Sequence, residues 1–275
     1  MRGRWWWLVV VGAIVLAGCT GTARRPAAGD SPPIPPAATG AIDGGEGLVI
    51  VVAPSLSGID EGLIHDAFRL VVAQGERDFG LRPERTVTVY VDPDSAIGLE
   101  DAIGLSQKNA IHLRAGQTHT MASLLPLLMH EYTHFLQYQI GRLRPQWWIE
   151  GEADFEALRV REPAAADRER RALYGQLAGD VRAGRAPHLA DLRGGLGWDD
   201  YIRKAGAGKA YGWGNAAVAF IEARAGFAGV VRVMTDTEGP NTLSRFDDVV
   251  RDVTGLGPDV FDDALKQWVV QQARA

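Results

Sequence analysis

The sequence predicts an α+β fold, with a small mixed sheet in a front lobe and mainly helices in a back lobe. Three short β-branched or alternating segments predict strands, and all lie in the first half of the chain, at residues 48–53, 86–91 and 110–114. From residue 123 onward, apolar residues recur mostly at helical spacing. We expect a cleft between the two lobes, with a helix over residues 123–140 lying in it.

The first 47 residues are expected to lie outside the folded part. Arg2 and Arg4 precede an apolar run that ends at Ala17, which is too short for a comfortable membrane span of about 20 residues. This pattern predicts a signal peptide. A polar stretch rich in Pro, Ala and Gly follows and is expected to be a disordered tether. The predicted divisions are the signal peptide (1–18), the tether (19–47) and a folded domain (48–275) with a front lobe (48–141) and a helical lobe (142–275).

The single cysteine, Cys19, lies where the apolar run gives way to the tether. This stretch resembles a bacterial lipobox, which implies cleavage before Cys19 and attachment of a lipid to its sulfur. The protein would then be exported and anchored to a bacterial membrane. An ordinary secretory signal, cleaved near Ala17 or Ala23, is the alternative. With one cysteine, no disulfide can form within the chain.

The composition suits a soluble extracytoplasmic domain. The chain has 29 Lys and Arg against 34 Asp and Glu, and the two signs are well mixed. Such a mildly acidic balance argues against a nucleic-acid partner. Hydrophobic residues make up 46% of the 275 residues, which is enough to bury a core. We expect a monomer.

Helices are predicted between and after the strands. Residues 62–79 have the spacing of an amphipathic helix that ends at Gly80. Ser123 is the expected cap of the next helix, which places Pro126 in its first turn, and Gly141 is the expected end. The Gly-rich segment 194–212 is expected to be mostly loop around one short helix. Further helices are predicted at residues 150–160, 164–183, 198–204, 211–224, 227–234, 246–253 and 260–271.

The motif H-E-Y-T-H begins at His130 and carries the chemistry. On a helix, His130 and His134 lie one turn apart on the same face, so both imidazoles can bind one metal ion. Zn²⁺ in a hydrolytic site takes three protein ligands and keeps one position open. Glu150, fifteen residues after His134, is the expected third ligand of a single zinc ion. The alternative is that the histidines are ordinary core residues and Glu150 is a solvated carboxylate at a helix start.

Roles follow for the neighbouring residues. Glu131 is expected to take the proton from the attacking water and to deliver it to the leaving amine. Asp154 is expected to accept the ring N–H of a ligating histidine, although it could be a surface carboxylate. Tyr211 is the candidate donor to the oxyanion, with a structural tyrosine as the alternative and His188 as the competitor. The side chains expected to be ordinary solvated or strand residues are Glu152, Glu156, His65, His112 and His119.

The two pieces H-E-x-x-H and E-x-x-x-D resemble the signature of gluzincin metallopeptidases of the MA clan, and more narrowly small bacterial peptidase MA-like domains. The resemblance implies a zincin-like fold, in which strand 110–114 is the sheet edge that pairs with an extended substrate. It supports the roles of Asp154 and Tyr211.

The Gly-x-Met-Glu-Asn segment with which gluzincin aminopeptidases hold a free N-terminus is absent, which favours an endopeptidase. The spacing from His134 to Glu150 is shorter than in thermolysin-like members, so their substrate pockets do not transfer.

We therefore expect a zinc metallopeptidase that hydrolyses a peptide or protein substrate outside the cytoplasm. One alternative is a non-catalytic envelope lipoprotein that keeps the same fold as a binding or structural module. Another is zinc-dependent hydrolysis of a different substrate, because metal ligands do not encode the substrate.

Overall fold

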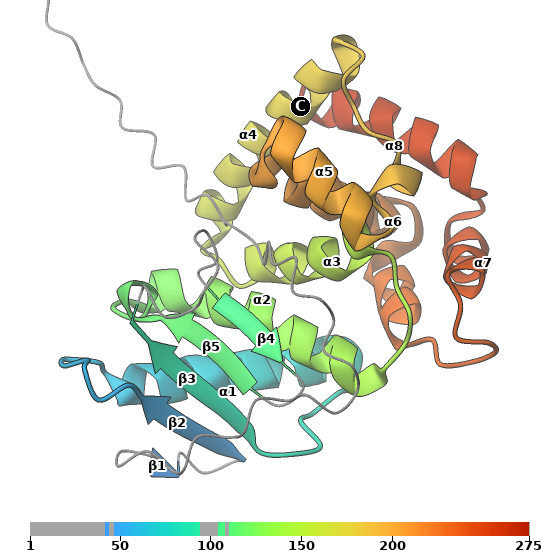
Figure 1. Ribbon diagram of the computed structural model, residues 1–275. Coiled ribbons are helices and arrows are strands. Elements are labelled where there is room, and N and C mark those ends of the chain that lie inside the picture. The colour runs from blue at the N-terminus through green and yellow to red at the C-terminus, as the bar shows by residue number, and fades with distance from the viewer. Residues whose placement is uncertain (1–41, 44–46, 94–103, 108–109, 275) are drawn as a thin grey trace, which may run out of the picture.

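The computed structural model describes residues 42–43, 47–93, 104–107 and 110–274 (Figure 1). The predicted signal peptide, nearly all of the tether and Cys19 lie outside these residues. The predicted α+β architecture is confirmed. In Figure 1 the sheet lies on one side of helix α3 (Gln146–Arg159), and several of the later helices lie on the other. Within the described part of the chain, no helix is long and apolar enough to cross a membrane.

The described strands form one five-stranded sheet. Its order is β1 (Ile42–Asp43), β2 (Leu48–Val52), β3 (Val87–Asp92), β5 (Ala110–Arg114) and β4 (Gly104–Gln107). Strands β2, β3 and β5 run parallel, and β1 and β4 pair antiparallel at the two edges. The expectation that residues 110–114 form the edge is wrong, because β4 pairs with β5 and covers it. β4 is short and was not predicted.

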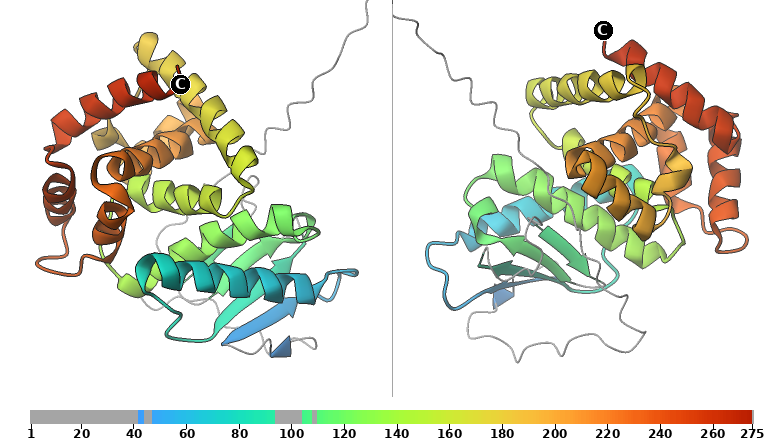
Figure 2. Two further views of the ribbon diagram at one scale, coloured as in Figure 1. Left: turned by 180° about the vertical axis from the view of Figure 1, so that it is seen from behind. Right: turned by 45° about the horizontal axis from the view of Figure 1, so that its top comes forward.

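Two helices cover one face of this sheet, as Figure 2 shows from behind: α1 (Glu61–Phe79) and α2 (Met121–Ile140). Alternation along the strands sends every second side chain toward these helices. Val89 on β3 pairs with Ile50 and Ile111 on its neighbours, and all three are buried. The mixed front lobe is therefore held by an apolar layer between sheet and helices.

Helix α2 begins one turn earlier than predicted. Thr120, not Ser123, is its N-cap, and its side chain accepts a hydrogen bond from Ser123 N. Pro126 consequently lies inside the helix and not in its first turn. Gly141 ends the helix as predicted, with a left-handed φ of 67° that suits glycine.

The back lobe is helical. Its helices are α3 (Gln146–Arg159), α4 (Pro163–Arg182), α5 (Gly195–Ala205), α6 (Ala207–Thr235), α7 (Leu243–Thr254) and α8 (Pro258–Gln272), with a short 3₁₀ turn, η2 (Leu189–Leu192), between α4 and α5. A second 3₁₀ turn, η1 (Ala115–Gln117), lies in the front lobe between β5 and α2. Helix α3 packs between α2 and α6. The two helices predicted at 211–224 and 227–234 belong to α6, which is interrupted by non-helical Gly226.

The expectation of loop across residues 194–212 is also wrong, because α5 and the start of α6 fill most of this segment. Glycines here allow close packing. A Cβ on Gly197 would lie 2.0 Å from Asp191 O, and one on Gly212 would lie 2.4 Å from a Leu173 methyl carbon. Glycine composition alone does not separate this use from loop formation.

The backbones of α3 and α6 touch at a pair of glycines. A Cβ on Gly151 would lie 2.3 Å from the carbonyl carbon of Gly214, and one on Gly214 would lie 2.5 Å from Trp147 O. Neither helix can carry a side chain at this crossing. Because Gly151 follows Glu150 directly, the crossing fixes where Glu150 is presented.

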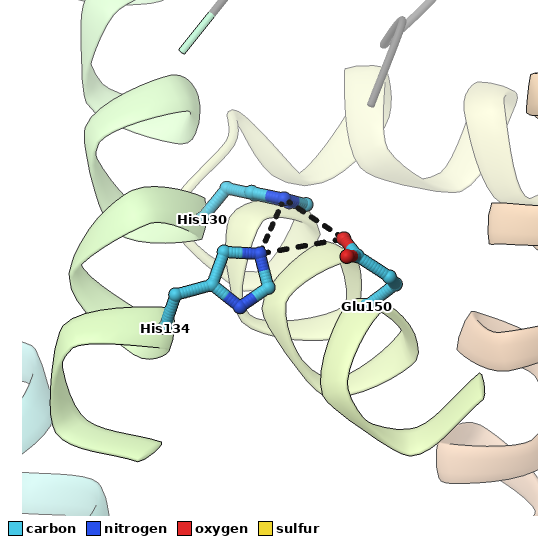
Figure 3. Close-up of side chains that lie close together, drawn as sticks. All are labelled: His130, His134 and Glu150. Atoms are coloured by element: carbon cyan, nitrogen blue, oxygen red, sulfur yellow. Dashed lines mark hydrogen bonds and ion pairs between the residues drawn. The ribbon is translucent and has the colours of Figure 1, made fainter. Parts of the chain in front are cut away.

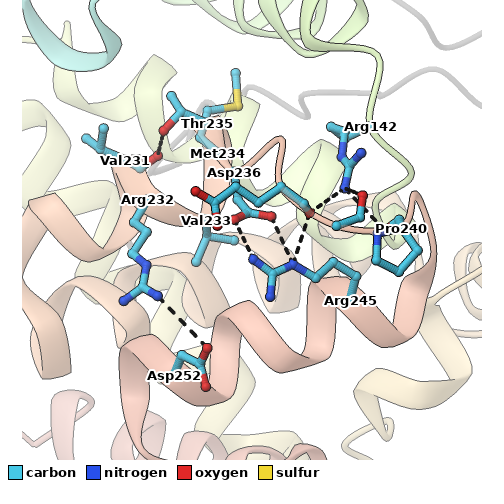
Figure 4. A network of polar contacts seen from close by, with 12 residues as sticks. Arg142, Val231, Arg232, Val233, Met234, Thr235, Asp236, Pro240, Arg245 and Asp252 are labelled. Atoms are coloured by element: carbon cyan, nitrogen blue, oxygen red, sulfur yellow. Dashed lines mark hydrogen bonds and ion pairs between the residues drawn. The ribbon is translucent and has the colours of Figure 1, made fainter.

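The connector between α2 and α3 is anchored to the back lobe by two arginines. Arg144 Nη2 donates to the carbonyls of Val233 and Asp236 at 3.1 and 3.0 Å. Arg142 Nη2 donates to the carbonyl of Pro240 at 3.2 Å, in the loop where Asp236 also binds Arg245 (Figure 4). The connector between the two histidines and Glu150 is thus bound to the back lobe at two points.

Candidate metal centre

Two adjacent helices bring His130, His134 and Glu150 together. The histidines project from one face of α2, and Glu150 points at them from α3 (Figure 3). The two Nε2 atoms lie 3.1 Å apart. Glu150 Oε2 lies 3.6 Å from His130 Nε2 and 3.3 Å from His134 Nε2. In the described residues, this is the cluster whose donor atoms are close enough to bind one metal ion.

The spacing of these three atoms fits a zinc ion. With the three sides at 3.1, 3.3 and 3.6 Å, one point lies about 2 Å from all three atoms, which is the length of Zn–N and Zn–O bonds. Two imidazoles and a carboxylate are a donor set found in catalytic zinc sites. Gln146 Nε2 donates to Glu150 Oε1 at 2.8 Å, which leaves Oε2 toward the histidines.

The outer nitrogen of each imidazole faces an acceptor. Asp154 Oδ1 lies 2.9 Å from His130 Nδ1, and Gln137 Oε1 lies 3.0 Å from His134 Nδ1. With a metal bound, each Nδ1 would carry the hydrogen and each Nε2 would direct a lone pair into the space between the rings. Three lone-pair-bearing atoms within 3.6 Å repel one another unless a cation lies among them. The residues present fit a bound divalent metal.

The charges of the ligands favour a cation as well. Burial would raise the pKa of Glu150, but the neighbouring His134 and His130 lower it below its ordinary value. Burial would lower the pKa of His130, but the nearby carboxylates of Asp154 and Glu150 raise it well above its ordinary value. Both shifts favour a negative charge on Glu150 and a positive charge beside it, which is the charge that a bound metal ion would supply.

Glu131 lies beside the cluster without belonging to its donor set. Its side chain is buried, and Oε2 has no hydrogen-bond partner among the described residues. Burial raises the pKa of Glu131, and the nearby His130 and His134 partly oppose this shift. A carboxyl group with a raised pKa beside a metal site is suited to accept and release a proton near neutral pH.

Tyr211 and His188 have different positions. Tyr211, in the second turn of α6, is buried, and its ring centre lies 6.3 Å from that of His130 and 5.3 Å from that of Trp198. It therefore borders the cluster. His188 is largely exposed, and its Nδ1 lies 2.8 Å from Asp262 Oδ2 on α8.

The expectation that Glu152 and Glu156 are solvated is wrong. Both have 0% exposure, because α3 is covered on several sides by α2, α6 and their neighbours. Burial raises the pKa of Glu152 to about 8 and that of Glu156 well above its ordinary value. A helix that is covered on several sides has no wide solvated face, so the periodicity of its sequence does not show where its charged side chains lie.

The sequence interpretation also missed Gln137 and Gln146. Gln137 Nε2 donates to Ile149 O and to Glu152 Oε2, both at 3.0 Å. A signal existed for both amides. Gln137 follows His134 by three residues and Gln146 precedes Glu150 by four, which are the spacings at which helical side chains meet.

The comparisons with known proteins bear on the fold. No protein-family model matches the chain, and a search of curated proteins finds no match. Among solved structures, the chain is similar to a glutamate-to-alanine variant of an M1 zinc metallopeptidase from Deinococcus radiodurans, with a TM-score of 0.50 and 17% identity. That match covers 81% of this chain and 48% of the other chain. A two-domain M1 zinc metallopeptidase variant bound to L-arginine gives a TM-score of 0.49 and 15% identity over 82% and 48% of the two chains.

The class that follows is a zincin-like α+β fold with a His-His-Glu cluster that could bind a metal. The chain spans about half the length of the structures it resembles.

Proposed function

We propose that this protein is a zinc-dependent metallopeptidase. The observation that carries the proposal is the convergence of His130 Nε2, His134 Nε2 and Glu150 Oε2 beside the buried carboxyl group of Glu131. The fold likeness supports it, since the M1 enzyme from Deinococcus radiodurans is a zinc metallopeptidase.

The roles of the residues follow from their positions. A zinc ion held by the three ligands would supply Lewis acidity, which activates water and polarises a substrate carbonyl. Glu131 takes the proton of the attacking water and passes it to the leaving amine. Asp154 holds the ring of His130 through its Nδ1. Tyr211 donates a hydrogen bond to the developing oxyanion at the edge of the site.

The finer proposals concern substrate and place. The absence of a Gly-x-Met-Glu-Asn segment supports an endopeptidase acting on a peptide or protein chain. The apolar run before Cys19 supports export and a lipid anchor in a bacterial envelope membrane. The mature protein would then act outside the cytoplasm.

Metal analysis and hydrolysis of casein by the full-length protein in detergent test the proposal. We expect one zinc ion per chain, lost in His134→Ala and kept in His65→Ala, a matched change on the surface of α1. Glu131→Gln should keep zinc and lose hydrolysis by about 100-fold or more. Wild-type protein without stoichiometric zinc would overturn the proposal, and full activity in Glu131→Gln would remove the role of Glu131.

Burial of the ligands favours a second candidate, a non-catalytic module with a structural metal. His130, His134 and Glu150 have exposures of 5%, 5% and 3%. A structural zinc site is closed by a fourth ligand, whereas a catalytic site keeps a position open. X-ray absorption of the zinc-loaded protein separates the two, since a fourth protein ligand supports the module and a water oxygen supports the peptidase. Zinc-dependent hydrolysis of a non-peptide substrate would appear as bound zinc without casein cleavage.

A further inference from the structure

We propose that Gln137 is a positioning residue of the metal centre, and that Glu152 and the backbone of α3 hold its amide so that it orients His134. The inference rests on the proposed function, because it requires that His134 binds a metal. It concerns two residues, Gln137 and Glu152, that lie outside the set of metal ligands.

The orientation of the Gln137 amide is determined by its neighbours. Its Nε2 lies 3.0 Å from Ile149 O and 3.0 Å from Glu152 Oε2. A backbone carbonyl can only accept hydrogen bonds, so the NH₂ group must face α3. The amide oxygen, Oε1, is therefore directed at His134 Nδ1, 3.0 Å away.

This orientation fixes the tautomer of His134. An amide oxygen is an acceptor, so His134 Nδ1 must be the donor, and in the neutral imidazole that binds a metal Nε2 then carries the lone pair. That Nε2 lies 3.3 Å from Glu150 Oε2, as a metal ligand requires. With the amide reversed, Nδ1 would carry the lone pair and Nε2 the hydrogen, and His134 could not bind the metal through Nε2.

Gln137 also connects the two helices that carry the ligands. Gln137 is on α2 with His134, and Glu152 is on α3 two residues after Glu150. The carboxyl group of Glu152 has 0% exposure, so water does not compete for this contact. His130 is braced in the same direction by Asp154. Each histidine of α2 is thus oriented by a contact that reaches α3.

The two braces differ in charge. His130 faces the carboxylate of Asp154, whereas His134 faces a neutral amide. A carboxylate partner makes an imidazole a stronger donor to a metal, and a neutral partner does so less. His134 is therefore the weaker donor of the pair.

The test measures metal binding by the full-length protein in detergent, with Zn²⁺ in competition with a chelator and with Co²⁺ by its visible spectrum. Gln137→Met removes both hydrogen-bonding groups at nearly constant volume. We expect affinity for Zn²⁺ to fall about 10-fold to 100-fold and the Co²⁺ spectrum to change. The matched control is Gln139→Met on the same helix, which loses bonds to Arg82 O and Glu84 N but should bind as the wild type does.

A charge exchange separates positioning from general packing. Gln137→Glu alone places two carboxyl groups side by side and should weaken binding. The double variant Gln137→Glu/Glu152→Gln restores a donor and an acceptor between the two positions, and keeps an acceptor for His134. We expect it to bind Zn²⁺ more tightly than Gln137→Glu alone and to recover part of the Co²⁺ spectrum, since a carboxylate at position 137 cannot replace the bond to Ile149 O. Recovery would not follow from a role in packing alone.

Two results would overturn the inference. One is equal Zn²⁺ affinity in Gln137→Met and Gln139→Met, and the other is a double variant that binds no better than Gln137→Glu. If Gln137→Met does not fold, ¹⁵N NMR of the zinc-loaded wild type decides. A protonated Nδ1 on His134 supports the inference, and a protonated Nε2 overturns it. Wild-type protein that binds no zinc would instead overturn the proposed function.

Discussion

The sheet lobe and the crossing of α2 with α3 are both buried, but they bury different chemistry. In the described part of β2, α1, β3 and β5, no polar or charged side chain is fully buried. The two helices, by contrast, bury a set of ionisable side chains: His130, Glu131, His134, Glu150, Glu152, Asp154 and Glu156. Buried charges cost free energy unless they are paired or bind a metal. The contrast therefore separates a region that stabilises the fold from one that keeps charge for chemistry.

A charge placed in the sheet layer should have the largest effect. Val89→Asp puts a carboxylate at a position with 0% exposure, between neighbouring strands that offer it no partner. We expect a loss of about 4 kcal/mol or more in unfolding free energy, or no folded protein. Urea unfolding followed by circular dichroism measures it. Thr88→Asp, on the opposite face of β3, should cost about 1 kcal/mol or less, and equal losses would contradict the contrast.

A methyl group at the glycine crossing should have the next largest effect. Gly151→Ala places a Cβ 2.3 Å from the backbone of Gly214, so α3 and α6 must separate. We expect about 3 kcal/mol of destabilisation and weaker zinc binding, because Glu150 moves with the backbone. The control is Gly175→Ala in α4, where a Cβ meets nothing within 4 Å. It should stabilise the protein by about 0.4–1 kcal/mol, and a similar loss in both variants would argue against a specific contact.

Glu156 tests whether a buried carboxyl group away from the metal ligands costs stability. Burial raises its pKa despite Arg159, and Asp78 and Glu152 add to the shift. The folded protein therefore binds a proton more tightly than the unfolded chain, whose value is about 4.5. This contribution is fully present below pH 4.5 and is lost as pH rises toward the folded pKa, by up to about 1.4 kcal/mol per pH unit.

Glu156→Gln removes this titration. We expect the variant to equal the wild type near pH 4.5 and to be more stable by about 2 kcal/mol at pH 8. Urea unfolding between pH 4.5 and 8 measures the difference. The same change at the exposed Glu84 should leave the pH profile as it is, and parallel profiles for Glu156→Gln and wild type would refute the expectation.

Asp154 should have the smallest effect, and one that depends on metal. Asp154→Asn weakens the orientation of His130, so zinc affinity should fall about 10-fold. The stabilisation gained on adding zinc should then shrink by about 1.4 kcal/mol, measured by thermal unfolding with and without the metal. Asp180→Asn removes another buried carboxylate, paired with Arg185 and Lys209, and should lower stability equally in both conditions. A zinc-independent loss at Asp154 would assign it to the fold.

The sheet lobe was largely predictable from the sequence because its chemistry repeats. Alternating β-branched residues gave β2, β3 and β5 within a residue or so, and the spacing of α1 gave its bounds equally well. Strand β4 was not predicted because its four residues are too few to show an alternating hydrophobic pattern. The helices of the Gly-rich segment 194–212 were mistaken for loop because some of its glycines allow close contact with neighbouring segments, which depends on the tertiary structure.

The site was predictable in part for the same reason. The one-turn spacing of His130 and His134 is a local property, and the structure brings Glu150 to them. The burial of Glu152 and the contacts of Gln137 depend on which helices surround α3, and no local pattern reports that.

The contact of Gly151 with Gly214 limits how far helix α3 can move relative to the metal centre. A helix seated through side chains can shift when those side chains repack, and so accommodate a ligand of different length. Helix α3 rests backbone against backbone on α6, and the arginine-anchored connector restrains its start. Helix α3 therefore cannot move toward the metal to compensate for a shorter ligand. Replacing Glu150 by the shorter aspartate should therefore leave a gap that the helix does not close, so this centre is suited to one ligand length and is a poor starting point for redesign by ligand exchange.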